Sequence, residues 1–537
     1  MSSWILLPVF LPAVAGLCLL AGALREYIRS GKATAAADKV EDVEGRVAVE
    51  KGKQLRGLHM FTAIVLIITA ALALAAVWSG EHSVTFFYLM KDIPIYFHID
   101  GVGRLFVTFM TIIWVLVGIY SFTYMKHEGN EKRFFGLYLL AYGVLIGLDF
   151  SGNLVTMYLF YELLTLVSMP MVMHSGTHES IMAALKYLFY SMCGAYMGLF
   201  GIFYLYRYCG TLSFVAGGSL DLGILAGHEG FLLAVVFVML VGFGAKAGMF
   251  PLHAWLPTAH PVAPCPASAV LSGVIVKAGV LMTLRVVYYV VGADFLRGTW
   301  VQTAWMSLTL ITVFMGSMLA YREKVFKKRL AYSTVSQVSY ILFGLSLMQS
   351  EAVTGALMHV VFHGFIKCAL FLTAGVFIFQ YGKTRVDEFL GLGKKMPVTM
   401  WSYTLASLAL IGIPPASGFI SKWHLAEGAL NADVGVFRYL GPAVLLVSAL
   451  LTAGYLLPVT MNGFFPGKGK QENGGQSAPA TEQGNEGQTV PVTIQERQEP
   501  PLGMRIPLVI LAALGVLLGI FPNLLEQLIS GIVSILM

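Results

Sequence analysis

Apolar runs of about 20 residues recur along the whole chain, and they constrain its fold more than any other feature. A helix of that length crosses a hydrocarbon core of roughly 30 Å. Of the 537 residues, 57% are hydrophobic and only 12% are charged, which leaves too little polar surface to coat a soluble globule. The sequence therefore predicts an all-α, polytopic membrane protein.

We predict about 14 transmembrane helices, numbered as spans 1 to 14. They cover residues 4–24, 58–79, 100–125, 134–152, 153–174, 181–206, 230–257, 265–291, 301–321, 329–348, 351–381, 397–428, 437–464 and 504–521. Span 1 ends in small residues like a signal peptide, but no basic residue precedes it, so we interpret it as uncleaved.

Basic residues gather on alternate connections between the spans. The connections after spans 1, 3, 9 and 11 hold Arg25, Arg29, Lys32, Lys39, Arg46, Lys51, Lys53 and Arg56, then Lys126, Lys132 and Arg133, then Arg322, Lys324, Lys327, Lys328 and Arg329, then Lys383, Arg385, Lys394 and Lys395. The opposite connections hold little beyond Lys91, Arg207, Arg297 and Arg438. By the positive-inside rule, the odd-numbered connections are cytoplasmic and both termini lie outside. This bias accounts for most of the net charge of +6, so no nucleic-acid partner is expected.

Two polar segments interrupt the apolar pattern, and both are expected to be cytoplasmic loops. Residues 25–57 mix both charge signs with small residues and are interpreted as partly helical. Residues 465–503 have the Gly, Gln, Glu, Ser and Pro bias of a disordered linker.

The cysteines do not predict a metal or redox centre. Cys18, Cys193, Cys209, Cys265 and Cys368 are scattered singly, with no C-x-x-C pair. His359 and His363 lie four residues apart, but HVVFH lacks the glutamate of H-E-x-x-H, and no third ligand is evident. We therefore expect neither a metal nor a bound cofactor.

Two spans are over-long and rich in Gly or Pro near their middle. Span 7 contains GFGAKAGMFPLHAWLP, span 12 contains LIGIPPASGFISKWH, and each holds one lysine. The segments are five spans apart, so they run in opposite directions. Interrupted helices at matched positions of inverted halves indicate a transport path at the midplane. The alternative is that Gly and Pro are common in transmembrane helices anyway.

Charged and titratable residues form a series inside the spans, although a charge at bilayer depth costs roughly 2.5 to 3.5 kcal/mol on insertion scales. The series is Glu162, Lys246, Lys277, His359, His363, Lys367 and Lys422. The spacing of 359, 363 and 367 puts those three on one helical face. Histidine titrates near neutral pH and burial lowers a lysine pKa, so we hypothesise that each position can hold or release a proton. If Glu162 pairs with Lys246, its withdrawal would favour proton release by that lysine.

Other interpretations of these residues stay open. A lone lysine can extend to the headgroups, above all Lys367. Lys186 and Lys327 lie near helix ends, where extension to the headgroups and participation are equally plausible. His253 and His260 bracket WLP at a span boundary and either line an access path or cap the interface.

Several ordered motifs resemble one family. The segments FYELLTLVSMPMV, AKAGMFPLHAWLPTAHPVAPCPASAVLSGVIVKAG, RLAYSTVSQVSYI, HVVFHGFIKCALFL and IGIPPASGFISKW are similar to the antiporter-like proton-translocating subunits of respiratory complex I, Mrp sodium/proton antiporters and group 4 membrane-bound hydrogenases. The likeness runs from about Asp100 to Met461, and FHIDGVGRLF is similar to the opening of the family's third helix. The pattern around AHP leans toward the hydrogenase and Mrp D-type branch.

The resemblance implies a fourteen-helix core with two inverted five-helix repeats and a proton path along a central hydrophilic axis. Glu162 and Lys246 look like the helix 5 glutamate and its helix 7 lysine partner. Lys277 is similar to the helix 8 connecting lysine, and Lys422 to the terminal helix 12 residue. His359, His363 and Lys367 are similar to the helix 11 relay.

The sequence also departs from the family pattern. Val325 stands where an aspartate is common, so a role for that acid is in doubt. Residues 522–537 are too short to form the lateral helix of the largest complex I member.

These features divide the chain as follows. Residues 1–99 hold two N-terminal helices with the cytoplasmic loop 25–57, 100–133 hold helix 3, 134–291 the first inverted repeat, 301–464 the second, 465–503 a disordered cytoplasmic loop, and 504–537 a C-terminal helix.

The primary hypothesis is a proton-translocating subunit of a multisubunit redox-driven or Mrp-type complex in a prokaryotic cytoplasmic membrane. Its partners would be the other membrane subunits, protons, sodium ions in an Mrp-type complex, and lipid. One alternative is a self-sufficient antiporter exchanging a cation or small solute for protons. Another is a non-transporting scaffold or quinone-contacting subunit, which leaves the buried charges unexplained.

Overall fold

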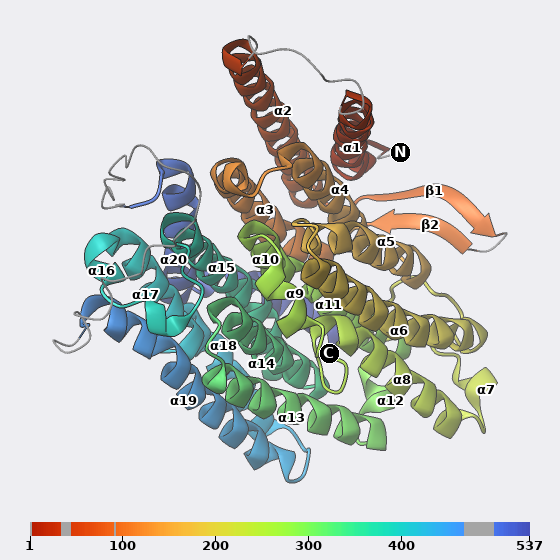
Figure 1. Ribbon diagram of the computed structural model, residues 1–537. Helices are drawn as coiled ribbons and strands as arrows, with labels where there is room; N and C mark the ends of the chain where they lie inside the picture. The colour runs from red at the N-terminus through yellow and green to blue at the C-terminus, as the bar shows by residue number, and fades with distance from the viewer. Residues whose placement is uncertain (1–2, 34–43, 91–92, 467–498) are drawn as a thin grey trace.

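The computed structural model describes residues 3–33, 44–90, 93–466 and 499–537, and it is a bundle of helices (Figure 1). Within these residues, 11 helices are long and apolar enough to cross a membrane. They cover Ser3–Ile28, Leu55–Trp78, Gly101–Glu128, Leu154–Val172, His178–Tyr208, Glu229–Ala247, Cys265–Val291, Trp300–Arg322, Ser350–Tyr381, Phe437–Phe464 and Leu502–Ile520. The prediction of a helical, polytopic membrane protein is confirmed.

The helices follow one another with short connections. The first half contains α1 (Leu7–Ala33, after the 3₁₀ turn Ser3–Leu6), α2 (Glu44–Trp78), α3 (Gly101–Glu128), α4 (Glu131–Asp149), α5 (Leu154–Val172), α6 (His178–Tyr208), α7 (Leu222–Leu225), α8 (Glu229–Ala247), α9 (Leu256–Val262), α10 (Cys265–Val270) and α11 (Lys277–Arg285). The second half contains α12 (Ala293–Leu296), α13 (Trp300–Arg322), α14 (Phe326–Ser346), α15 (Ser350–Tyr381), the 3₁₀ turn η4 (Val386–Glu388), α16 (Leu392–Lys395), α17 (Pro397–Ile411), α18 (Ser417–Asn431), α19 (Phe437–Phe464), α20 (Leu502–Ile520) and α21 (Asn523–Leu536).

Three predicted crossings are not among the 11 long apolar helices. Charged residues in the first turns of α4 and α14 lower their mean hydropathy, and span 12 is divided into α17 and α18, each 15 residues long. All of them pack inside the bundle, α4 against α1 and α5, and α14 against α13 and α15. Fourteen crossings therefore remain a prediction.

Two helical segments form the centre of the bundle. Cys265–Val291 is wholly buried, and α15 is almost wholly buried. α15 packs against α18, α14, α20, α17 and α3, so it has neighbours on every side. Helices that are apolar all round occupy this kind of position. Lys277, His359 and His363 therefore lie in the most enclosed part of the chain.

A β-hairpin precedes α3, and the sequence analysis did not predict it. β1 (Ser83–Met90) pairs antiparallel with β2 (Ile93–His98), with Ser83 opposite His98. Its β-branched and aromatic residues favour a strand. In Figure 1 the hairpin extends from the bundle beside α5. It is the only sheet in the part of the chain that the structure describes.

The polar segments are partly outside the described residues. The segment 25–57 is helical at both ends, because α1 continues to Ala33 and α2 begins at Glu44. The predicted loop 465–503 falls mostly on residues 467–498, which lie outside the described ranges. Residues 522–537, judged too short for a lateral helix, contain α21, which packs on α15 and α3.

Candidate functional site

Lys246 lies at the break in span 7. α8 ends at Ala247, and Gly248, with a φ of 81°, turns the chain out of the helix before α9 begins at Leu256. The Lys246 ammonium is fully buried and donates hydrogen bonds to the Tyr161 carbonyl (2.9 Å) and the Thr165 hydroxyl (2.7 Å). It also lies 4.0 Å from the centre of the Tyr161 ring, a cation–π contact. Both partners belong to α5.

Glu162 is half-buried on the same helix. One of its carboxylate oxygens, Oε1, is buried without a hydrogen-bond partner. The carboxylate interacts electrostatically with Lys246, but the described residues show no contact ion pair between them. The arrangement therefore contains a carboxylate beside the lysine, with the lysine bonded to neutral oxygens of α5.

Lys277 follows a π-helical segment, Leu271–Ile275. In this segment the amide of Val276 bonds to the carbonyl of Leu271, five residues back. The Lys277 ammonium donates to the carbonyls of Ser272 (3.0 Å) and Gly273 (2.5 Å) and contacts His363 Nδ1 at 2.8 Å. An ammonium needs such partners away from water, and the local π-helix supplies two of them.

The two histidines of α15 continue from this contact. The ring centres of His363 and His359 are 6.0 Å apart, and His363 Nε2 is buried without a partner. His359 lies between Ser421 Oγ (2.9 Å from Nδ1) and Gln337 Oε1 (3.1 Å from Nε2). Its ring stacks on Tyr340 with centres 5.7 Å apart.

Lys367 is the third predicted position on this face of α15, but its ammonium bonds to a different helix. Its ammonium is fully buried and donates to the Leu330 carbonyl (3.0 Å) and the Ser333 hydroxyl (2.7 Å) of α14. Ser333 also accepts a hydrogen bond from Tyr455 (2.7 Å). The structure therefore places Lys367 in the interior and not at the headgroups.

Lys422 lies just after the break in span 12. Gly412, with a φ of 89°, ends α17, and the Lys422 ammonium donates to the carbonyls of Leu410 (2.7 Å) and Ile411 (2.9 Å). These are the last carbonyls of α17, and a cation there is favoured by the helix dipole. The ammonium also lies 5.2 Å from the centre of the Tyr340 ring.

Together these side chains form one row. Tyr340 contacts both Lys422 and His359, His359 neighbours His363, and His363 contacts Lys277. α11 packs tightly on α8, since a Cβ at Gly279 would lie 2.7 Å from the Ala247 nitrogen, next to Lys246. We call Lys246, Lys277, His363, His359 and Lys422 the buried row, with Lys367 as a side branch; Lys422 is half-buried and the other four are buried.

Two of the four possible supporting residues lie near Lys367. His260 is fully buried, neither ring nitrogen has a partner, and its ring stacks 4.6 Å from that of Phe371, one turn from Lys367. Lys327 donates to the carbonyls of Pro261 (3.0 Å) and Ala263. His253 and Lys186 interact electrostatically with each other and are half-buried.

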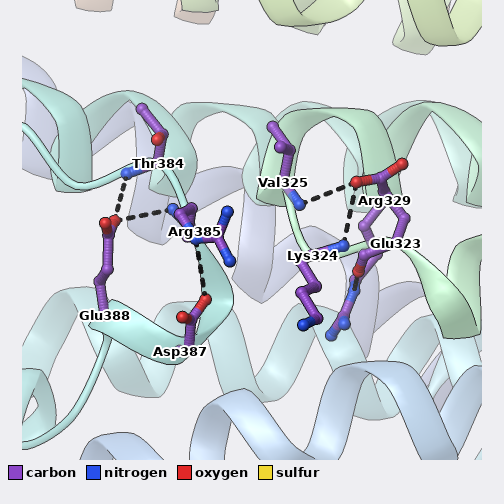
Figure 2. A network of polar contacts seen from close by, with 8 residues as sticks. All are labelled: Glu323, Lys324, Val325, Arg329, Thr384, Arg385, Asp387 and Glu388. Atoms are coloured by element: carbon purple, nitrogen blue, oxygen red, sulfur yellow. Dashed lines mark hydrogen bonds and ion pairs between the residues drawn. The ribbon is translucent and has the colours of Figure 1, made fainter.

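A cavity of about 50 Å³ adjoins Lys327, and Lys383 and Thr384 line its other side. Figure 2 shows the polar contacts beside it, which form one group in the α13–α14 connection and another in the α15–η4 connection. Glu323 accepts from the amides of Lys324 and Val325, and Glu388 from those of Thr384 and Arg385. Burial raises the pKa of Glu323, but its hydrogen bonds from the Lys324 and Val325 amides and from Lys328 outweigh that effect. The pKa of Glu323 therefore lies below its usual value. These polar contacts form without an acid at position 325.

Sequence reasoning missed a buried charge cluster at the start of α3. Arg285 makes a two-pronged ion pair with Asp100 (2.5 and 2.8 Å), and the buried Asp149 interacts with the same guanidinium. Asp100 also accepts from the Gly103 amide as the N-cap of α3. The signal was present, because Arg285 lies inside the apolar run of span 8.

Comparison with known sequences identifies the relatives of this fold. A profile described as "NADH:quinone oxidoreductase/Mrp antiporter, TM" matches residues 151–452, and one described as "NADH-Ubiquinone oxidoreductase (complex I), chain 5 N-terminus" matches residues 89–135. NADH-quinone oxidoreductase subunit N of Desulforudis audaxviator is 33% identical over 487 residues, covering 89% of this chain and 92% of the relative. The D-type subunit of the Na(+)/H(+) antiporter of Alkalihalophilus pseudofirmus is 29% identical, covering 69% and 74%. Hydrogenase-4 component B of Escherichia coli is 31% identical, covering 66% and 54%.

Solved structures share the fold. A chain of the archaeal membrane-bound sulfane sulfur reductase superposes with a TM-score of 0.78 at 21% identity, covering 100% of this chain and 98% of that one. A chain of respiratory complex I from Thermus thermophilus superposes with a TM-score of 0.72 at 22% identity, covering 99% and 100%.

Proposed function

Because this chain belongs to the antiporter-like membrane subunit family of complex I, Mrp antiporters and membrane-bound hydrogenases, we propose that it moves protons along the buried row. In this proposal it works as one subunit of a multisubunit assembly in a prokaryotic cytoplasmic membrane. Redox chemistry in partner subunits, or an ion gradient in an Mrp-type assembly, would supply the energy.

The observation that carries the proposal is the set of contacts that links Lys277, His363, His359 and, through the Tyr340 ring, Lys422. Each of the three lysines of the row donates to oxygens inside the protein, and the central contact joins Lys277 directly to His363. Lys277 and His363 lie within hydrogen-bonding distance, so a proton can pass directly between these two groups. Intramembrane ionisable residues that face a bundle interior are the usual components of such relays.

The two helix breaks support an arrangement as two inverted five-helix repeats, residues 134–291 and 301–464, with fourteen crossings. Gly248 is followed three residues later by Pro251, and Gly412 three residues later by Pro415. Both glycines have a positive φ and end the first half-helix. A lysine lies beside each break, which is where inverted-repeat transporters hold their ion sites.

Glu162 is the residue through which, in this proposal, a charge change in a partner subunit affects the row. Its carboxylate is half-buried, and it interacts with Lys246 without a hydrogen bond. A nearby negative charge favours the ammonium form of a lysine. We infer that a charge change next to Glu162, made by a partner subunit, alters how readily Lys246 holds its proton.

Protons reach the row, in this proposal, from the cavity beside Lys327. The route would pass from Lys327 to His260 and then to Lys367. Support comes from the unpartnered nitrogens of His260 and from the cavity at Lys327. His253 and Lys186 lie elsewhere, beside the span 7 break, and are assigned no step.

The second candidate is a self-sufficient cation/proton antiporter. It predicts exchange by this chain alone after reconstitution. Two of the named relatives are described as subunits and one as a component, which favours the assembly.

The test is proton pumping by membrane vesicles that contain the native assembly, measured by a pH-sensitive dye. Lys246→Ala and Glu162→Ala should each reduce pumping at least tenfold while the subunit is still incorporated. Lys394→Ala, an exposed lysine outside the row, is the matched control and should pump normally. Normal pumping by the Lys246 variant would refute the proposal.

A further inference from the structure

A groove lies between α1 and α2, away from the buried row. The 3₁₀ turn before α1 meets the segment that follows α2, where the rings of Trp4 and His82 are 5.4 Å apart. At the other ends of the two helices a cavity of about 1100 Å³ separates them, closed on one side by the α3–α4 connection. In Figure 1, α1 and α2 likewise separate toward the end of α1 and the start of α2.

The position of α1 is fixed by α4, which packs on it beside the groove. A Cβ at Gly16 would lie 2.5 Å from the Gly136 carbonyl, so the backbones of α1 and α4 are in close contact. Leu19 lies about 60° around α1 from Gly16, next to this contact, and lines the groove.

The groove has an apolar wall and a charged end. Leu19, Leu58 and Phe61 line the wall, and Lys126, Lys132 and Arg133 line the end. Leu58 and Phe61 are three residues apart on α2, about one helical turn. A groove with an apolar wall and a basic end matches the shape of a phospholipid. The acyl chains would lie along the wall and the phosphate at the basic end.

Among the residues that the structure describes, the acids at the charged end do not neutralise all of its basic groups. Its two acids are engaged, Glu26 by Lys132 at 2.6 Å and Glu131 by His59. Arg133 donates to a carbonyl, that of His174, and keeps its charge. Lys126 makes no hydrogen bond or ion pair to any residue that the structure describes. The end of the groove therefore offers positive charge to an anion.

We propose that this groove binds an anionic phospholipid, with its phosphate at Lys126 and Lys132 and its acyl chains along Leu19, Leu58 and Phe61. The distribution of basic loops places this end at the cytoplasmic leaflet, whose surface potential is negative. Basic pockets between transmembrane helices on that side suit anionic headgroups. The site is independent of proton transfer along the buried row.

The experiment is photocrosslinking of the full chain, purified with the subunits of its native assembly, in phosphatidylcholine nanodiscs. The probe is phosphatidylglycerol with a diazirine in one acyl chain, and a phosphatidylcholine diazirine analogue is the comparison. The phosphatidylglycerol probe should label peptides containing residues 19–27 and 55–61 at least fivefold more strongly, and unlabelled phosphatidylglycerol should compete.

Lys126→Gln should weaken this labelling about fivefold, as expected for one basic group near a headgroup. The change removes no internal contact among the described residues, so folding should be preserved. Lys394→Gln is the control and should label normally. Equal labelling by both probes, no effect of Lys126→Gln, or crosslinks from a partner protein to the same wall would each overturn the proposal.

Discussion

At the scale of single residues, the cationic side chains of the row are stabilised by hydrogen bonds to oxygen or nitrogen atoms inside the protein. Lys277 has two carbonyls and a histidine, and Lys422 has two carbonyls at a helix end. Without such partners, a buried charge would cost several kcal/mol. The sequence identified these lysines because their charge conflicts with their apolar neighbours. It did not identify the partners, because most of them are backbone carbonyls, which every residue has.

Arg285 shows the limit of that reasoning. Its charge conflicts with its neighbours as strongly as that of Lys277, yet its partner Asp100 is 185 positions away in the chain. Only the folded structure brings the two together. Their pairing joins the start of α3 to the end of α11.

Asp100→Asn tests this ion pair. Asparagine preserves the N-cap of α3, so the change isolates the loss of charge opposite Arg285. We expect a loss of roughly 3 kcal/mol, because a buried guanidinium would lose its carboxylate. The measurement is the thermal unfolding midpoint of the purified assembly. Adding Arg285→Met to the variant should restore part of the loss, and an additive further loss would contradict the account.

At the scale of elements, the helix breaks could be predicted and several other features could not. Gly and Pro in the middle of spans 7 and 12 identified the breaks. The π-helix before Lys277 left no sequence signal, since its residues are ordinary helix and strand formers. The β1–β2 hairpin was missed because a short hairpin between two long apolar spans resembles a loop. α4 and α14 were predicted, although charges in their first turns lower their mean hydropathy.

Gly412→Ala tests the span 12 break. At a φ of 89° an added Cβ is strained, and here it would lie 3.2 Å from Lys422 Cδ. We expect about 1 kcal/mol of destabilisation together with reduced proton pumping, because α17 and Lys422 would both shift.

Gly435→Ala is the matched control, because its φ is 56° and nothing lies within 4 Å of the added Cβ. It should show a similar destabilisation, because alanine is strained at a positive φ, but no loss of pumping. If both variants pump equally well, the geometry of the break does not matter for transport.

At the scale of the whole molecule, the family and the helical membrane fold were predictable from ordered motifs and hydropathy, and both are confirmed. The series of side chains was also predicted, but the contacts that each one makes were not, because they depend on how α8, α11, α15 and α18 pack. His359, His363 and Lys367 of α15 illustrate this. These three positions share a face, yet Lys367 bonds to α14 while His363 contacts α11.

The central claim is that the basic groups of the row act by changing their protonation. Lys277→Arg tests it most directly, because arginine keeps the positive charge but does not release a proton at physiological pH. Lys277→His is the companion variant, since histidine can still titrate.

The measurement is the initial rate of proton pumping by vesicles containing equal amounts of assembled complex. We predict that Lys277→Arg lowers the rate at least tenfold and that Lys277→His retains a larger fraction of it. Pumping at the unmodified rate by the arginine variant would contradict the account, because a fixed charge would then suffice.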